Sequence, residues 1–251
     1  STVYAPGLKY TMLPDDWIDA FSLNAGRAAP VLSLYAEIDT ETHEVLSTES
    51  RLERLRIESN LRHDLLDAIV TEETIVSGGF DSPHAAELST LWQVARKLLA
   101  RREQVRGRPE PTGRVDYSFE LDGVDDQARV LIRQRRRGSP LDSIVAELMI
   151  FANSVWGGWL AARRTAGIYR SQALGRVKMG TAPAAHEGIG VEHYAWCTSP
   201  LRRYVDLVNQ RQLLACVHEL PRPYASNDAE LFAIVSGFEA AYGAYAEFQQ
   251  K

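Results

Sequence analysis

The residues best suited to chemistry lie in the segment Tyr194–Val208, where two arginines follow a Ser-Pro pair. Ser199 is a typical helix cap and proline is favoured at the first helical position, so a helix is predicted to begin at Pro200. Arg202 and Arg203 would then lie in its first turn, beside backbone N–H groups that have no partner within the helix. Positive side chains are disfavoured there unless an anion binds, because the helix already presents partial positive charge. The pattern therefore indicates a phosphate-binding site.

Asp206 permits a second interpretation of the same segment. It follows Arg202 by four residues and Arg203 by three, so its carboxylate can hold one guanidinium in place. Together with Ser199 it would then support an arginine site structurally. The same spacing is also that of a local salt bridge on a solvated helix, and the two interpretations stay open.

A second cluster of interest is the segment Ile144–Asn153, which places Glu147 and Asn153 within a very apolar helical pattern. A buried carboxylate is costly unless it is paired or binds a ligand. The alternative is that Glu147 lies on an exposed stripe of the helix.

Other charged groups give weaker signals. The run Arg135–Arg137 could guide a nucleic-acid backbone, although charge runs are usually solvated. Asp122, Asp125 and Asp126 fall in a predicted turn, where aspartate is favoured for backbone reasons. The six histidines show no zinc-ligand spacing, and no metal site is predicted in this chain.

Composition sets the broad class. The 251 residues are 45% hydrophobic and 24% charged, as in an ordinary globular protein. The net charge of −5 argues against a general polyanion binder. No apolar run approaches the roughly 20 residues that cross a bilayer, and the first residues lack a secretory signal pattern. A cytoplasmic protein without a membrane partner is expected.

The pattern of elements predicts an α+β fold, strand-rich in its first half and helix-rich in its second. Residues 4–14 are expected to form a loop. Strands are predicted at 31–39, 115–119 and 128–132, and the turn Asp122-Gly123 joins the last two into a hairpin. Helices are predicted from Ser82-Pro83, from Ser139-Pro140, at 200–218 and at 228–248.

Four ordered segments resemble the ribonuclease II family. Thr198–Leu207 is similar to the family signature TSP-[IL]-R-[RK]-Y-x-D-[LM], which is long and specific. The other matching segments are Thr2–Gly7 with Met12–Pro14 and Ser22-Leu23, Ile144–Asn153 with Ile168–Arg170, and Phe238-Glu239. The resemblance covers nearly the whole chain and implies an RNB-type domain, with a mixed-sheet or barrel-like core surrounded by helices.

The resemblance also implies an activity, which is processive hydrolysis of single-stranded RNA from the 3′ end to nucleoside 5′-monophosphates. Arg202 matches the catalytic arginine that contacts the scissile-end phosphate, and such a group can stabilise charge on a phosphoryl group. Tyr4 matches an aromatic residue that stacks on the terminal bases. Glu147 and Glu239 match glutamates that line the RNA end of the channel.

Two further RNA contacts are expected beside these. Tyr117 or Phe119 is the expected partner of Tyr4 in the base stack, and Arg203 is expected to bind RNA next to Arg202. Family members often have histidine where this chain has Gln210, which weakens any role assigned to that position.

The sequence also departs from the family. Such enzymes hold Mg²⁺ with an aspartate cluster upstream of the segment matched by Tyr4, and this sequence begins after it. Residues 1–251 are therefore expected to be a partial RNB-type domain without the aspartate cluster or the flanking OB-fold domains, inactive until the rest of the enzyme is supplied. The alternatives are a non-catalytic RNA-binding homologue and a structural domain with no RNA role.

Overall fold

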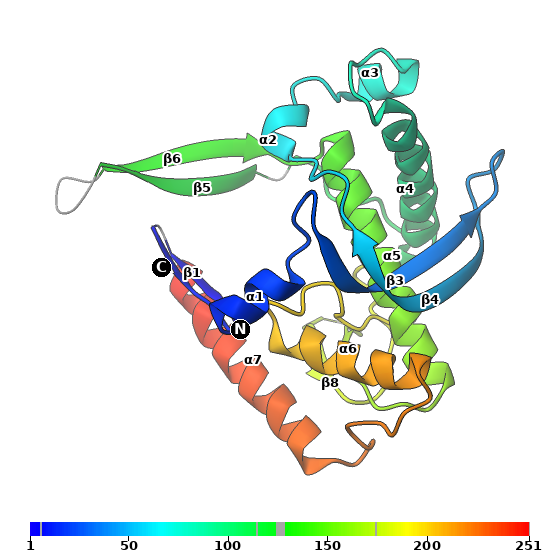
Figure 1. Ribbon diagram of the computed structural model, residues 1–251, viewed down its shortest axis with the longest axis vertical. Helices are drawn as coiled ribbons and strands as arrows, with labels where there is room; N and C mark the ends of the chain where they lie inside the picture. Colours follow the sequence, from blue (N-terminus) through cyan, green and yellow to red (C-terminus); the bar gives the residue numbers. More distant parts are fainter. Residues whose placement is uncertain (6, 114, 124–128, 174, 251) are drawn as a thin grey trace.

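Four separate antiparallel hairpins carry the strands of the computed structural model, which describes residues 1–5, 7–113, 115–123, 129–173 and 175–250 (Figure 1). Each strand pairs with the next along the chain, so the local turns set the pairing. The hairpins are β1 (Val3–Ala5) with β2 (Leu8–Tyr10), β3 (Ala28–Ile38) with β4 (Val45–Arg56), β5 (Val115–Asp122) with β6 (Arg129–Arg136), and β7 (Tyr169–Ser171) with β8 (Lys178–Gly180).

Helix α5 runs through the middle of the molecule, with α4 and α6 packed against it (Figure 1). The helices are α1 (Asp15–Phe21), α2 (His63–Leu66), α3 (Glu72–Ser77), α4 (Ala85–Arg106), α5 (Pro140–Ala162), α6 (Tyr204–Val217) and α7 (Ala229–Gln250). The hairpin β5–β6 projects away from this body, and the N-terminus lies beside α7, the last helix of the chain (Figure 1).

The predicted α+β class is confirmed, and each predicted strand and helix is present with altered bounds. The barrel-like core is not confirmed, because no sheet closes on itself within the described ranges. The first residues were expected to form a loop, but β1 and β2 pair there, with Tyr4 opposite Lys9. Two strands of three residues carry too little alternation to be predicted from the pattern alone.

The predicted start of α5 is confirmed by a capping box. The Ser139 hydroxyl accepts a hydrogen bond from the Asp142 N–H at 3.2 Å, and the Asp142 carboxylate accepts from the Ser139 N–H at 3.4 Å. The same carboxylate accepts from Arg135 Nη2 at 2.8 Å, so one arginine of the Arg135–Arg137 run ties the base of β6 to the start of α5.

Three apolar clusters form the core, and α5 takes part in two of them. The first half of α5 joins α3 and α4 through Leu141 and Ile144, and its second half joins α6 and β3 through Trp156 and Leu160. The third cluster lies between α6, α7 and β7. By length and composition alone α5 could cross a bilayer, contrary to the expectation that no segment comes close. A core helix of a globular protein passes the same test, and α5 packs against α4, α6 and β3 through the clusters above.

A buried ion pair fastens α4 to α5. Arg102 Nε donates to one carboxylate oxygen of Glu147 at 2.8 Å, and Arg102 Nη2 donates to the other. Arg102 Nη1 also donates to the carbonyl of Ile189 at 2.5 Å, so Arg102 also holds the segment between β8 and α6. Glu147 is only 4% exposed, so it does not lie on an exposed stripe, and it meets the requirement that a buried carboxylate be paired.

Replacing Glu147 by glutamine should destabilise the fold by about 3–5 kcal/mol, because the buried Arg102 guanidinium would lose its counter-charge. Urea unfolding of the unaltered chain and of Glu147→Gln measures this difference. The control is Glu120→Gln, which removes the exposed ion pair with Arg133 and should cost less than about 1 kcal/mol. Equal losses in the two variants would contradict a stabilising role for the buried pair.

Candidate phosphate and RNA site

The segment Tyr194–Arg203, here called the arginine loop, carries the two arginines in irregular backbone before α6. The helix begins at Tyr204, so the predicted start at Pro200 is wrong. The Ser199 carbonyl instead accepts the N–H groups of Arg202 and Arg203 at 3.2 and 3.0 Å, which forms a turn. Ser199 is therefore no helix cap, and the argument from a first helical turn does not apply to these arginines.

Asp206 ties this turn to the first turn of α6. Its Oδ1 accepts from the Ser199 N–H at 2.8 Å and from Arg203 Nη2 at 2.7 Å. The structural roles expected of Ser199 and Asp206 therefore fit the geometry, but the pair with Arg203 is not on a solvated surface. Asp206 is 0% exposed, and burial raises its pKa above the ordinary value because it outweighs Arg203 and the Ser199 N–H.

Buried amides complete the support of the arginine loop. Asn153 of α5 accepts from the Cys197 N–H at 2.8 Å, and Asn209 of α6 donates to the Trp196 carbonyl at 2.9 Å. Gln210 donates to the Cys197 carbonyl at 2.7 Å, which gives it a structural role. Since irregular backbone cannot satisfy its own polar groups, these side chains determine where the loop lies.

Sequence reasoning named Asp206 as a support of the arginine site but not Asn209 or Gln210. Asp206, Asn209 and Gln212 follow one another at intervals of three along α6, and all three are 0% exposed. A polar stripe at helical spacing can equally be a solvated face, so the spacing alone does not reveal that these groups are buried.

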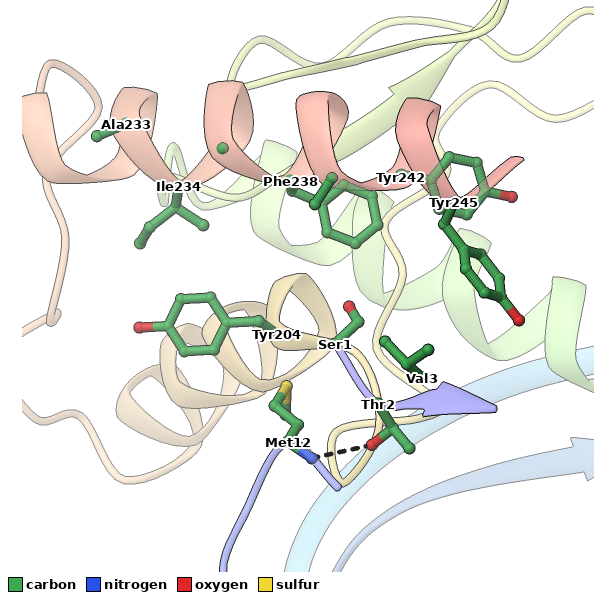
Figure 2. Close-up of a pocket in the computed structure, with 12 residues that line it drawn as sticks. Ser1, Thr2, Val3, Met12, Tyr204, Ala233, Ile234, Phe238, Tyr242 and Tyr245 are labelled. Carbon is green, nitrogen blue, oxygen red and sulfur yellow. Dashed lines mark hydrogen bonds between the residues drawn. The ribbon is translucent and has the colours of Figure 1, made fainter. Parts of the chain in front are cut away.

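The N-terminal strand joins the arginine loop directly. The Thr2 N–H donates to the Arg202 carbonyl at 2.9 Å, and the Thr2 hydroxyl accepts from the Met12 N–H at 3.1 Å (Figure 2). Tyr4, two residues further along β1, is exposed, as is the Arg202 side chain. Among the described residues no partner of the Arg202 guanidinium is found. The structure thus brings the expected phosphate contact and the expected stacking residue to one region of the surface.

Trp196 is the aromatic centre of this region. The Cζ atoms of Arg203 and Arg170 lie 4.1 and 4.5 Å from the centroid of its ring. Phe238 and Tyr242 of α7 contact the same ring edge-on. Nothing in the sequence distinguishes Trp196 from the other four tryptophans, because the partners come from distant segments.

An apolar pocket of about 380 Å³ lies between the first residues, α6 and α7. Figure 2 shows Phe238, Tyr242 and Tyr245 of α7 on one side, with Tyr204 and Met12 facing them. Glu239, the other expected RNA contact on α7, accepts a hydrogen bond from the Met179 N–H of β8 at 2.9 Å through its Oε1. Its side chain is exposed.

Tyr117 and Phe119 lie on β5, and both are exposed. They share one face of the strand with Leu121, because side chains alternate along a strand. A Cβ atom at Gly7 would overlap the Leu121 side chain, so this face approaches the turn between β1 and β2. The arrangement fits the expectation that Tyr117 or Phe119 partners Tyr4, although no direct ring contact joins them among the described residues.

Glu147 is the one expected RNA contact that the structure places elsewhere. Both its oxygens are bonded to Arg102 in the buried pair between α4 and α5. Its contact with RNA stays a prediction, and it would require this ion pair to open.

The residues present do not fit a metal centre. No group of three or more histidine, cysteine or acidic residues comes together in the described part of the chain. Asp206, the carboxylate bonded at the arginine loop, is buried and binds Ser199 and Arg203. The Cys197 thiol is no candidate nucleophile, since burial raises its pKa well above the ordinary value.

An α+β domain with an exposed arginine beside exposed aromatics defines a candidate site for phosphate and stacked bases. The sequence profile of the RNB domain matches residues 1–175 and 171–219. The chain therefore belongs to the RNB domain family, which confirms the resemblance to the ribonuclease II family.

Relatives of known name are similar over most of this chain. Exoribonuclease 2 of Edwardsiella piscicida is 28% identical over 88% of the chain, and that of Psychromonas ingrahamii is 25% identical over 84%. The chain spans 42% and 40% of the lengths of these two proteins.

Solved structures share the fold. An active-site mutant of the Dss1 exoribonuclease from Candida glabrata superposes with a TM-score of 0.81 at 21% identity, over 99% of this chain and 37% of that one. RNase R of Mycoplasma genitalium with ribose-methylated single-stranded RNA gives 0.67 at 17% identity, over 86% and 41%. Yeast Ssd1, a pseudonuclease, gives 0.69 at 17% identity, over 95% and 35%.

The raised pKa of Asp206 predicts a pH dependence of stability. The folded chain holds a proton at Asp206 more tightly than the unfolded chain, where the pKa is near 3.8. This contribution is fully present below pH 3.8 and is lost as the pH rises through the higher folded-state pKa. Asp206→Asn does not titrate and keeps an acceptor for Ser199 and Arg203. Urea unfolding across this range should therefore show the unaltered chain losing stability relative to Asp206→Asn as the pH rises. If the stability of the unaltered chain relative to Asp206→Asn stayed constant or increased as the pH rises, the raised pKa of Asp206 would be contradicted.

Proposed function

We propose that this chain is part of a 3′→5′ exoribonuclease that processively hydrolyses single-stranded RNA to nucleoside 5′-monophosphates. In this proposal the chain holds the 3′ end of the RNA in the catalytic domain. Arg202 contacts the phosphate at the scissile end, and Tyr4 stacks on a terminal base with Tyr117 or Phe119. Glu239 lines the same end of the channel, and the enzyme acts in the cytoplasm.

One observation carries the proposal, which is the exposed Arg202 side chain on a backbone held from both sides. The Arg202 N–H donates to Ser199, and its carbonyl accepts from Thr2, two residues before Tyr4. A guanidinium on a fixed backbone can grip a phosphate with two parallel hydrogen bonds. Stacking of bases on aromatics contributes about 1–3 kcal/mol per base without requiring a particular sequence.

Catalysis in this proposal also needs Mg²⁺ held by aspartates in another part of the enzyme. Bound there, the ion would activate water and stabilise the leaving oxygen. The described residues offer no ligand set for it, so the part assigned to this chain is binding and orientation of RNA.

A second candidate function is RNA binding without hydrolysis. It is favoured by the likeness to yeast Ssd1, a pseudonuclease with the same fold. Fold alone does not separate the two functions, because activity depends on the groups at the site.

Shortening of 5′-labelled single-stranded RNA in the presence of Mg²⁺ tests the proposal. The chain alone should give no ladder, whereas a protein that adds the aspartate-bearing segment of the RNB domain should shorten the RNA stepwise from its 3′ end. RNA that is bound but not shortened in both samples would favour the non-catalytic function. No binding in either sample would refute an RNA role.

In the complete enzyme, Arg202→Lys should lower turnover about 100-fold or more, because lysine keeps the charge but loses the bidentate grip. The rate constant from single-turnover shortening of the labelled RNA measures the effect. Arg211→Lys is the matched control, since Arg211 is an exposed arginine of α6 that bonds to Tyr224. Undiminished turnover in Arg202→Lys would rule out the role assigned to Arg202.

A further inference from the structure

Two guanidinium groups share one indole ring between β7, the arginine loop and α7. Arg170 comes from β7 and Arg203 from the end of the arginine loop, and both Cζ atoms lie within 4.5 Å of the Trp196 ring centroid. The ring itself is buried. A guanidinium stacks favourably on an aromatic face, and its planar fork of N–H donors matches the geometry of a phosphate group.

The charges in this cluster do not balance. Asp206 is the one carboxylate that bonds to either guanidinium in the described part of the chain, and it bonds to Arg203. The Arg203 Nε is buried without an acceptor, and Arg170 has no hydrogen-bond or ion-pair partner among the described residues. Both arginines stay protonated at physiological pH, so two cations share one buried carboxylate.

The protein environment reflects this imbalance. Burial lowers the pKa of Arg170, and the neighbouring Arg203 lowers it further. Glu239 does not correct the balance, because it bonds to the backbone of Met179, the β8 residue opposite Arg170. A bound anion would offset the second charge.

The form of the site favours a phosphodiester group as that anion. Planar guanidinium forks match tetrahedral phosphate oxygens better than a point charge does. Arg203 is also the chain neighbour of Arg202, whose exposed side chain is assigned to the scissile-end phosphate. A second phosphate grip beside the first suits a ligand with phosphates at regular intervals, which RNA is.

We propose that Arg170 and Arg203, held on Trp196, bind one phosphodiester group of RNA next to the group that contacts Arg202. This inference rests on the proposed RNA function and extends it to a second phosphate. Arg170 and Arg203 make the contacts, and Trp196 is a positioning residue that sets the planes of both guanidinium groups.

Binding of 5′-fluorescein single-stranded RNA at increasing salt tests the inference in the intact chain. Arg170→Gln should bind RNA about tenfold more weakly at 0.1 M salt, as expected for loss of a charged hydrogen-bonding group. The slope of log K against log salt should fall by about 0.7, the value for one lost phosphate contact on a single strand. Arg96→Gln is the matched control, because Arg96 is exposed and stacked on Trp92 of α4. Equal affinity and slope in Arg170→Gln and the unaltered chain would overturn the proposal.

A titration of the unaltered chain with inorganic phosphate makes the test independent of RNA function. The arginine Nε–Hε NMR signals of Arg170 and Arg203 should shift and saturate, whereas that of Arg96 should not. Each signal is assigned by its loss in the corresponding lysine variant. Arg170 and Arg96 signals that shift alike without saturation would overturn the proposal, even if the chain binds RNA.

The two measurements also separate this inference from the proposed function. Saturable phosphate binding with no RNA binding would refute the RNA function and replace the phosphodiester with free phosphate as the ligand. RNA binding with an unchanged salt slope in Arg170→Gln would keep the function and refute the second phosphate contact.

Discussion

The buried carboxylate of Asp206 is the constraint on which the arginine site depends. The arginine loop has neither helix nor sheet of its own, so its backbone polar groups need partners from elsewhere. Asp206 accepts from the Ser199 N–H and from Arg203, which draws the turn and one guanidinium onto α6. Burial of this carboxylate is tolerated because those partners replace part of its lost hydration.

The same logic extends to the helices that carry the loop. Asn153 of α5 accepts from the Cys197 N–H, and from α6 Asn209 donates to the Trp196 carbonyl and Gln210 to the Cys197 carbonyl. Two packed helices therefore hold the loop between them, and the apolar clusters around α5 hold those helices. The Arg202 side chain can stay exposed on a fixed backbone because the neighbouring residues Cys197, Ser199 and Arg203 make the hydrogen bonds that hold the loop to α6. Such fixed geometry is what a phosphate grip requires.

The RNB fold does not by itself determine whether a protein hydrolyses RNA. The same architecture is found in exoribonucleases and in a protein described as a pseudonuclease. Because fold does not imply function, the difference must lie in particular groups. In this chain the exposed Arg202, the stacked pair Arg170 and Arg203, and the aromatics around them offer hydrogen-bond donors and stacking faces, and the described residues offer no metal-ligand cluster.

The sequence alone determined the family, the α+β class and most helices and strands, since the Thr198–Leu207 signature and the Ser139 cap are local patterns. It could not determine that α6 begins at Tyr204, because residues 199–203 form a turn that is held to α6 through the Ser199 N–H and Asp206. Nor could it assign Glu147 to Arg102, which lies 45 positions away. The stacking of Arg170 and Arg203 on Trp196 was also decided only by tertiary structure. Local propensity acts over a few residues, whereas burial and charge pairing depend on which distant segments the fold brings together.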